Sequence, residues 1–179
     1  MGRTARCHRD GQTTAAVVQI PTGRIAMRYW LMKSEPDVFS ITDLENSPHR
    51  IAPWEGVRNY QARNFIRDQM QCGDRTYFYH SSCPIPGIAG IMEIARDAYP
   101  DDSACDPNSP YFDPKSRIDA PRWYRVDVRW VLTFERIVSI TELRRHPQLE
   151  NMPLLRRGNR LSVIPVSANE WQFIEKLAV

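Results

Sequence analysis

The sequence lacks a long apolar run, and its four cysteines form no close pair. It contains no stretch of about 18 apolar residues, the length that a membrane-spanning helix needs, so we expect no membrane span. No two cysteines stand in a C-x-x-C pair or another zinc-ligand spacing. This spacing argues against a zinc site or a disulfide framework. It favours an intracellular, reducing compartment, which is the cytoplasm or, in a eukaryote, the nucleus.

Positive charge is scarce once the N-terminus is set aside. Residues 1–26 hold four arginines and one acid, whereas the other 153 residues hold 20 basic and 20 acidic side chains. A general binder of polyanions needs a broad positive field, so this chain would bind a nucleic acid through a local site. The sequence also contains no internal repeat and no Gly-rich phosphate loop.

The length of 179 residues suits one domain with a sizeable core. Residues 1–26 are polar and hold few large apolar side chains, and Met27 stands directly before the first buried pattern. We therefore expect residues 1–26 to be disordered, or to be an extension upstream of the true start at Met27. The predicted domain is 27–179.

The apolar patterns predict an α+β domain. Strands are expected at residues 29–32, 76–81, 88–94, 122–134 and 161–166. Short helices are expected to begin after the capping residues Ser40, Ser139 and Ser167, and another helical pattern begins at Asn59. This order favours a small, curved or barrel-like, mostly antiparallel sheet with short helices packed around it.

Residues 97–119 contain four prolines among Asp, Asn and Ser and are predicted to form a loop. An ordered loop of this length is typically a functional lid or a flexible insertion.

The stretch from Trp54 to Asn64 combines residue types that suit a ligand better than a core. A flat ring such as Trp54 can stack on a planar ligand, and the amide of Asn59 can recognise its polar edge. Gly56 lets the backbone come close, and Arg58 can hold a phosphate. The alternative is a structural turn with a buried Trp and solvated arginines.

Polar residues at two strand ends are further site candidates. Ser34 and Glu35 follow the first strand, and His80 and Ser81 end the second. A hydroxyl beside an imidazole suggests catalysis, but neighbouring residues on a strand point to opposite faces. Arg160 belongs to a basic cluster near residue 157, for which a solvated surface is the default and a phosphate contact is the alternative.

Several motifs resemble the EVE domain family from Met27 to the C-terminus. They are YWLMKSEP (29–36), WEGVRNYQARN (54–64), YHS (79–81), PGIAG (86–90), YFDPK (111–115), PRWY (121–124) and LSV (161–163). The family frequently has Asp where Glu55 stands, and residues 1–26 lie outside its pattern.

This resemblance implies a PUA-like fold, related to YTH domains, and a binding module in place of an enzyme. It implies DNA or RNA carrying a modified base as partner, for example 5-methylcytosine flipped out of a strand. It implies neither a cofactor nor a metal.

A flipped base needs an aromatic platform, polar groups for its edge and a few groups for flanking phosphates. Trp54 is the expected platform. The other expected base-binding residues are Ser34, Gly56, Asn59, Tyr79, His80, Ser81 and Trp123. The residues expected to contact phosphates or the pocket rim are Lys33, Arg58, Arg160 and Ser162.

Two other functions remain open from the sequence. An enzyme acting on a nucleotide or small planar substrate would use His80, Glu35 and Asp127 as acid and base groups. Against it, the sequence shows no metal motif and no activated nucleophile. A protein-interaction domain would use residues 97–119 to bind an unidentified protein partner.

Overall fold

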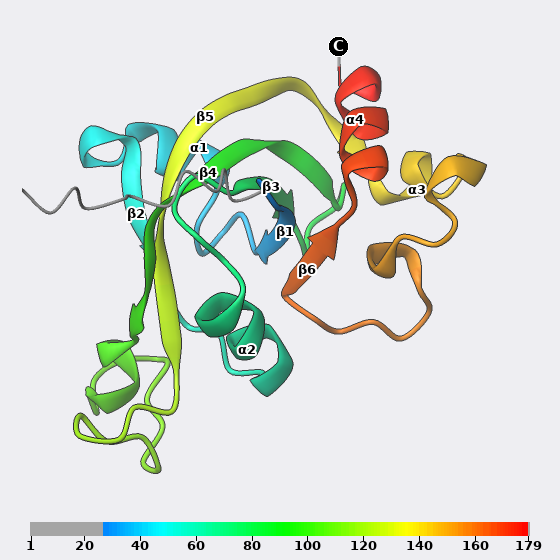
Figure 1. The fold of residues 1–179 in the computed structure, drawn as a ribbon. Helices are drawn as coiled ribbons and strands as arrows, with labels where there is room; N and C mark the ends of the chain where they lie inside the picture. The colour runs from blue at the N-terminus through cyan, green and yellow to red at the C-terminus, as the bar shows by residue number, and fades with distance from the viewer. Residues whose placement is uncertain (1–26, 179) are drawn as a thin grey trace, which may run out of the picture.

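The computed structural model describes residues 27–178. The expectation for residues 1–26 therefore lies outside the described residues. Figure 1 shows one mixed sheet with short helices around it, and its two longest strands bend into a curved ribbon. The predicted α+β fold is confirmed, and the sheet is curved but not closed, since its order is β2-β5-β4-β3-β1-β6.

The strands are β1 (Tyr29–Ser34), β2 (Ile51–Trp54), β3 (Arg75–His80), β4 (Gly87–Pro100), β5 (Tyr124–Ser139) and β6 (Val163–Val166). The α-helices are α1 (Ile41–Asn46), α2 (Tyr60–Asp68), α3 (Ile140–Leu143) and α4 (Ala168–Leu177). Four 3₁₀ turns complete the described elements: η1 (Pro48–Arg50), η2 (Asp102–Cys105), η3 (Pro147–Leu149) and η4 (Pro153–Leu155). β1 and β3 run parallel, and every other pair in the sheet is antiparallel.

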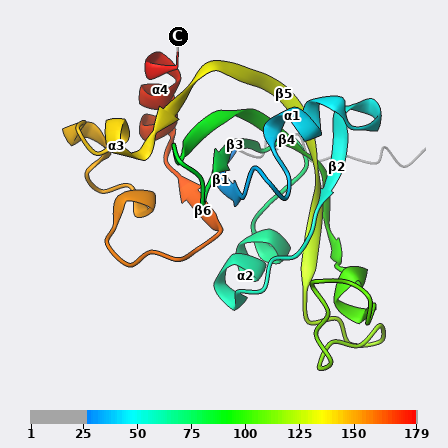
Figure 2. The same cartoon turned by 180° about the vertical axis from the view of Figure 1, so that it is seen from behind.

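The sheet buries both of its faces, because successive side chains of a strand point to opposite sides. On what we call the first face, Trp30, Trp54 and Phe78 pack with residues of α1 and α2. On the second face, Leu31, Tyr77 and Trp171 pack with residues of α3 and α4. Figure 2 shows α1 and β2 on one side of the molecule and α3 and α4 on the other.

Local signals account for the helix starts. Ser40 and Ser167 form capping boxes with Asp43 and Glu170, as expected. Asn59 caps α2. The box expected at Ser139 is only half formed: its hydroxyl accepts from the Glu142 backbone N–H, while the Glu142 carboxylate pairs with Arg136.

The structure differs from the expected strands in three places. β2 was not predicted; it is an edge strand, and this position tolerates Pro53. β4 continues to Pro100, so the predicted loop begins later. The alternation along β5 is interrupted by shifts in its register with β4, and Leu132 is left exposed.

Asp74 anchors the start of β1 from a buried turn. Its carboxylate accepts hydrogen bonds from the Trp30 indole (2.9 Å) and from the backbone N–H groups of Arg28 (3.0 Å) and Gln71 (3.1 Å). Removing it leaves three donors unsatisfied in a site where the Asp74 residue is only 4% exposed.

We predict that Asp74→Ala lowers the free energy of unfolding by about 3 kcal/mol. Urea denaturation, monitored by circular dichroism, measures this free energy. Asp68→Ala is the control, because Asp68 forms only a surface ion pair with Arg67. A loss no larger for Asp74→Ala than for this control would contradict the anchoring role.

Candidate nucleic-acid interface

A cavity of about 640 Å³ opens beside the first face of the sheet. It lies where the ends of β1 and β2 meet the segment that follows η2. β1 and the loop after it contribute Lys33, Ser34, Glu35, Val38 and Phe39. β2 and the residues after it contribute Ala52, Pro53, Trp54, Glu55, Gly56 and Val57. Tyr111 and Ser162 complete the lining from two distant segments.

Three aromatic residues line this cavity. Trp54 is held by edge-on contacts with Phe78 (centroids 5.2 Å apart) and Phe39 (6.3 Å) and is only 6% exposed. Phe39 and Trp54 therefore belong to the core and to the cavity wall at once. Tyr111 lines the cavity from the irregular segment after η2. A rigid aromatic wall of this kind suits a flat, apolar-faced ligand.

Gly56 allows Tyr111 to approach the cavity. Gly56 has φ +78°, and a Cβ added there would lie 2.6 Å from the Tyr111 ring. Both the backbone conformation and the lack of space therefore require glycine. This close contact joins the residues after β2 to a segment more than 50 residues away in the chain.

Asp101 and Arg58 hold that contact in place. The Asp101 side chain is fully buried, and its Oδ2 accepts from Arg58 Nη1 (2.7 Å) and from the Gly56 N–H (3.2 Å). Arg58 also donates from Nε to the Tyr111 carbonyl (2.9 Å). Burial acts to raise the pKa of Asp101, but hydrogen bonds from Ser103 and Arg58 outweigh it, so the pKa lies below its usual value.

This geometry changes the role expected for Arg58. We expected Arg58 at a phosphate or on the pocket rim, but Arg58 does not line the cavity. Its guanidinium is engaged with Asp101, Ser103 and Tyr111. Arg58 is thus a structural residue behind the cavity wall, and the burial of its partner makes it unsuited to a solvated phosphate.

Five of the twelve expected site residues line the cavity: Lys33, Ser34, Trp54, Gly56 and Ser162. The Lys33 backbone N–H donates to the Ser162 carbonyl (2.8 Å), which brings the start of β6 to the cavity. Burial lowers the pKa of Lys33, whose ammonium lies 5.7 Å from the centre of the Tyr79 ring. Their roles in binding remain predictions.

The expected wall of Tyr79, His80 and Ser81 is not formed. Tyr79 points to the second face and packs there, because β3 places Phe78 and Tyr79 on opposite sides. His80 Nε2 accepts from the Ile41 N–H (3.2 Å) at the start of α1. The Ser81 hydroxyl donates to the Ser34 carbonyl (3.2 Å). None of the three lines the cavity.

Three more expected residues lie away from the cavity. The Asn59 side chain accepts from the Gln61 and Ala62 N–H groups as the cap of α2. Trp123 stacks on Tyr60 (5.0 Å) and donates to Asp113 (2.7 Å). Arg160 is exposed on the loop before β6 and is not among the lining residues.

The sequence reasoning missed most of the apolar lining, including Phe39, Ala52, Val57 and Tyr111. Phe39 and Val57 look like ordinary core residues, and β2 was not recognised as a strand. Tyr111 lay in a motif of the resemblance but was given no role. Its position depends on Arg58 and Asp101, which no local pattern reveals.

Residues 27–178 contain neither a cluster of metal-ligating side chains nor a membrane-spanning helix. No group of three or more His, Cys, Asp or Glu side chains is placed to hold a metal ion in this part of the chain. Within the same range, no helix is long and apolar enough to cross a membrane.

Comparison with known proteins identifies the family. The family model described as EVE domain matches residues 28–177. The chain belongs to the EVE domain family. Human thymocyte nuclear protein 1 is 43% identical over 166 residues, which are 83% of this chain and 73% of the relative.

Two solved structures show the same EVE domain fold. A crystal structure of a Pseudomonas syringae protein superposes with a TM-score of 0.81 at 50% identity, covering 84% of this chain and 99% of that one. A crystal structure of the human THYN1 protein in complex with 5-methylcytosine-containing DNA has a TM-score of 0.80 at 42% identity. It covers 84% of this chain and 97% of that one.

Gly56→Ala is predicted to damage the cavity wall more than a matched glycine substitution elsewhere. Gly158 has φ +81°, but a Cβ there would meet nothing within 4 Å. Gly158→Ala should therefore cost only the backbone strain, about 1 kcal/mol of unfolding free energy. Gly56→Ala should cost about 1–3 kcal/mol more, because it also displaces Tyr111. Thermal melting of the two variants measures these losses of unfolding free energy. Equal losses for Gly56→Ala and Gly158→Ala would contradict the contact between Gly56 and Tyr111.

His80 is predicted to make stability depend on pH. Burial lowers the pKa of His80 below its ordinary value of 6.5, although Asp43 opposes this. A lowered folded-state pKa gives stability that is present above pH 6.5 and is lost as pH falls through the folded value. Protonation turns the Nε2 acceptor into a donor facing the Ile41 N–H.

We expect His80→Gln, which keeps an acceptor, to flatten the fall in unfolding free energy below pH 6.5. Urea denaturation at a series of pH values measures it, with His49→Gln at an exposed position as the control. The same pH dependence in wild type and His80→Gln would refute the capping role.

Proposed function

We propose that this EVE domain is a nucleic-acid-binding module that holds a methylated base, drawn out of its strand, in the cavity beside Trp54. The observation that supports it is the cavity itself, which combines a rigid aromatic wall with polar groups at its edge. The related human protein crystallised with 5-methylcytosine-containing DNA supports a base of this kind.

The cavity is large enough to admit one base, and its lining suits one. About 640 Å³ falls in the range of small-molecule sites, of roughly 300–1,000 Å³. Trp54 is the proposed stacking platform, since it lines the cavity although it is only 6% exposed, and Phe39 and Tyr111 would supply apolar surface for a methyl group. Ser34 and the backbone near Gly56 are the groups for the polar edge of the base.

The flanking strand would be held by few charges. Ser162 lines the cavity, and Arg160 is exposed on the loop before it. Lys33 also belongs to the lining, but its ammonium lies over the Tyr79 ring, which packs on the second face. Because the folded part has balanced charge, we expect log affinity to fall with log salt with a slope of only about −1 to −3. We infer that the protein acts in the compartment that holds its nucleic acid, the cytoplasm or a nucleus.

We infer that the domain binds without catalysing a reaction. The acid and base candidates do not share a site: His80 caps α1, and Asp127 accepts from Tyr99. Only Glu35 lines the cavity. Residues 97–119 were the candidate surface for a protein partner. Because they contribute Tyr111 to the cavity, we infer that this segment helps to build the base site.

The direct test is a titration of the full chain with matched oligonucleotides, single-stranded and duplex, at two salt concentrations. Half carry one central 5-methylcytosine and half carry cytosine. One methyl group in a fitted apolar pocket is worth about tenfold in affinity, and that preference is expected here. Equal binding of both sets, or none, would refute the proposal for this base.

We predict that Trp54→Phe weakens binding of the methylated oligonucleotide roughly three- to tenfold. Stacking of one base on an aromatic ring is worth roughly 1–3 kcal/mol, and the smaller Phe ring loses only part of it. Phe keeps the buried aromatic contact with Phe78, so the fold is preserved. Trp171→Phe is the matched control, because Trp171 is equally buried but lies on the second face. Equal effects of the two substitutions on affinity would contradict the assigned platform.

A further inference from the structure

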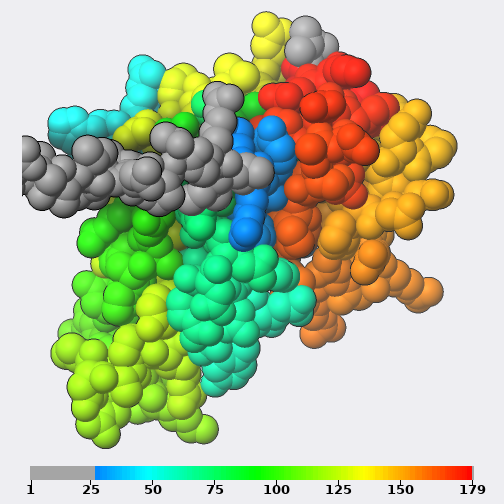
Figure 3. Space-filling model, viewed as in Figure 1, coloured from blue at the N-terminus to red at the C-terminus, as the bar shows by residue number. Residues whose placement is uncertain are grey.

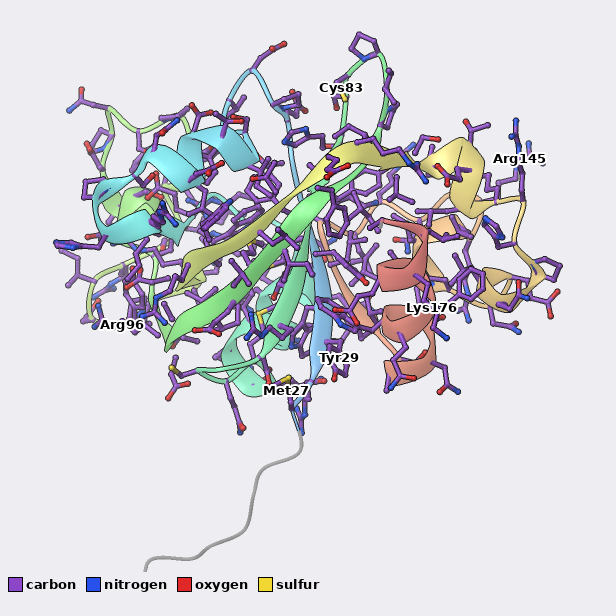
Figure 4. The ribbon with its side chains drawn as sticks, turned by 90° about the horizontal axis from the view of Figure 1, so that it is seen from above. Met27, Tyr29, Cys83, Arg96, Arg145 and Lys176 are labelled. Atoms are coloured by element: carbon purple, nitrogen blue, oxygen red, sulfur yellow. The ribbon has the colours of Figure 1, made fainter. Side chains whose placement is uncertain are left out.

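Two exposed apolar side chains stand on neighbouring loops, of which the first lines the cavity. Val38 is 64% exposed on the loop after β1, and Ile85 is 60% exposed on the loop after β3. Because β1 and β3 are adjacent and parallel, both loops leave the same end of the sheet. Figure 4 shows these loops projecting side by side, with Cys83 labelled on the second.

Hydrogen bonds tie the two loops together. The Ser81 N–H donates to the Ser34 carbonyl (2.8 Å), and the Ser82 hydroxyl donates to Glu35 Oε1 (3.0 Å). Ser34 and Glu35 both line the cavity. The loop after β1 therefore forms one edge of the cavity mouth, and the loop after β3 is held against it.

Val38 is presented rigidly on this edge. Its backbone N–H and that of Phe39 both donate to the Glu35 carbonyl at 2.9 Å, which makes a tight turn. The next side chain, Phe39, is fixed between Trp54 and Phe78. Val38 thus points outward directly beside Phe39, which points into the core. Because the backbone of Val38 is already held in place, little conformational entropy is lost when Val38 contacts a ligand.

A base that leaves a duplex creates a gap in the stack. Proteins that unstack or kink DNA commonly insert an apolar side chain between base steps, which compensates for the lost stacking. A single exposed valine is ordinary on a protein surface. Val38 differs because it is exposed and also lines the cavity that would receive the base, which is where a gap-filling side chain must stand.

We propose that Val38 inserts into duplex DNA at the gap left by the extruded base and that Ile85 packs against the adjacent step. The inference rests on the proposed function, because it needs a base in the cavity. It adds that the domain acts on paired DNA and lowers the cost of opening the pair. A single strand has no stack to repair, so Val38 should distinguish duplex from single-stranded ligands.

The test compares wild-type protein with Val38→Ala on a duplex and on the single strand of the same sequence, each with one central 5-methylcytosine. We expect the ratio of duplex to single-strand affinity to fall about tenfold, the effect of about two buried methyl groups. Ile85→Ala should lower the same ratio less. Ile118→Ala is the control, because Ile118 is 89% exposed on the segment that extends away from the body of the molecule (Figure 3).

A second readout follows base opening directly. With 2-aminopurine beside the methylated cytosine, saturating wild-type protein should raise the fluorescence of the duplex, and Val38→Ala should raise it less. An unchanged affinity ratio, or wild-type binding to single strands only, would overturn the wedge while leaving the base cavity intact. Failure of wild-type protein to bind any methylated oligonucleotide would instead overturn the proposed function.

Discussion

The buried carboxylate of Asp101 is the interaction on which the cavity depends. It accepts from Arg58 and from the Gly56 N–H, and Arg58 in turn donates to the Tyr111 carbonyl. The residues after β2 and a region more than 40 residues later in the chain thus meet at one charge that has no access to water. Removing one partner of a buried ion pair is costly, because it leaves the other charge uncompensated. The cavity wall is therefore built before any ligand arrives, which reduces the ordering cost of binding.

The second constraint on the site is that successive side chains of a strand point to opposite faces of the sheet. Phe78 on β3 supports Trp54 on the first face, while its neighbours Tyr77 and Tyr79 pack on the second. The same sheet therefore carries the site on one face and a plain apolar core on the other. At the end of the parallel pair β1 and β3, the loop after β1 carries Val38 to the mouth of the cavity, and the loop after β3, which carries Ile85, is bonded to it. Phe78 and the proposed wedge thus derive from the adjacent strands β3 and β1, and the base platform Trp54 from the edge strand β2.

Features with a local physical cause could be predicted from the sequence. The capping residues Ser40 and Ser167 begin their helices where expected, and α2 begins where the pattern turned helical. The expected residues Ser34, Trp54 and Gly56 line the cavity. Features set by distant contacts could not. Arg58 suits a phosphate in sequence, but a buried Asp 43 residues away engages it. Strand alternation separates Tyr79 from Phe78 and His80, but the sequence alone does not show which of the two faces carries the cavity.

A crystal structure of the full chain with a duplex that contains one central 5-methylcytosine tests the central claim most directly. The account predicts the methylated base outside the helix and inside the cavity, with its ring against Trp54 and with Gly56 and Tyr111 in their present contact. A base bound elsewhere, for example on the second face beside Tyr79, would contradict the account. So would a duplex bound with every base still paired and stacked.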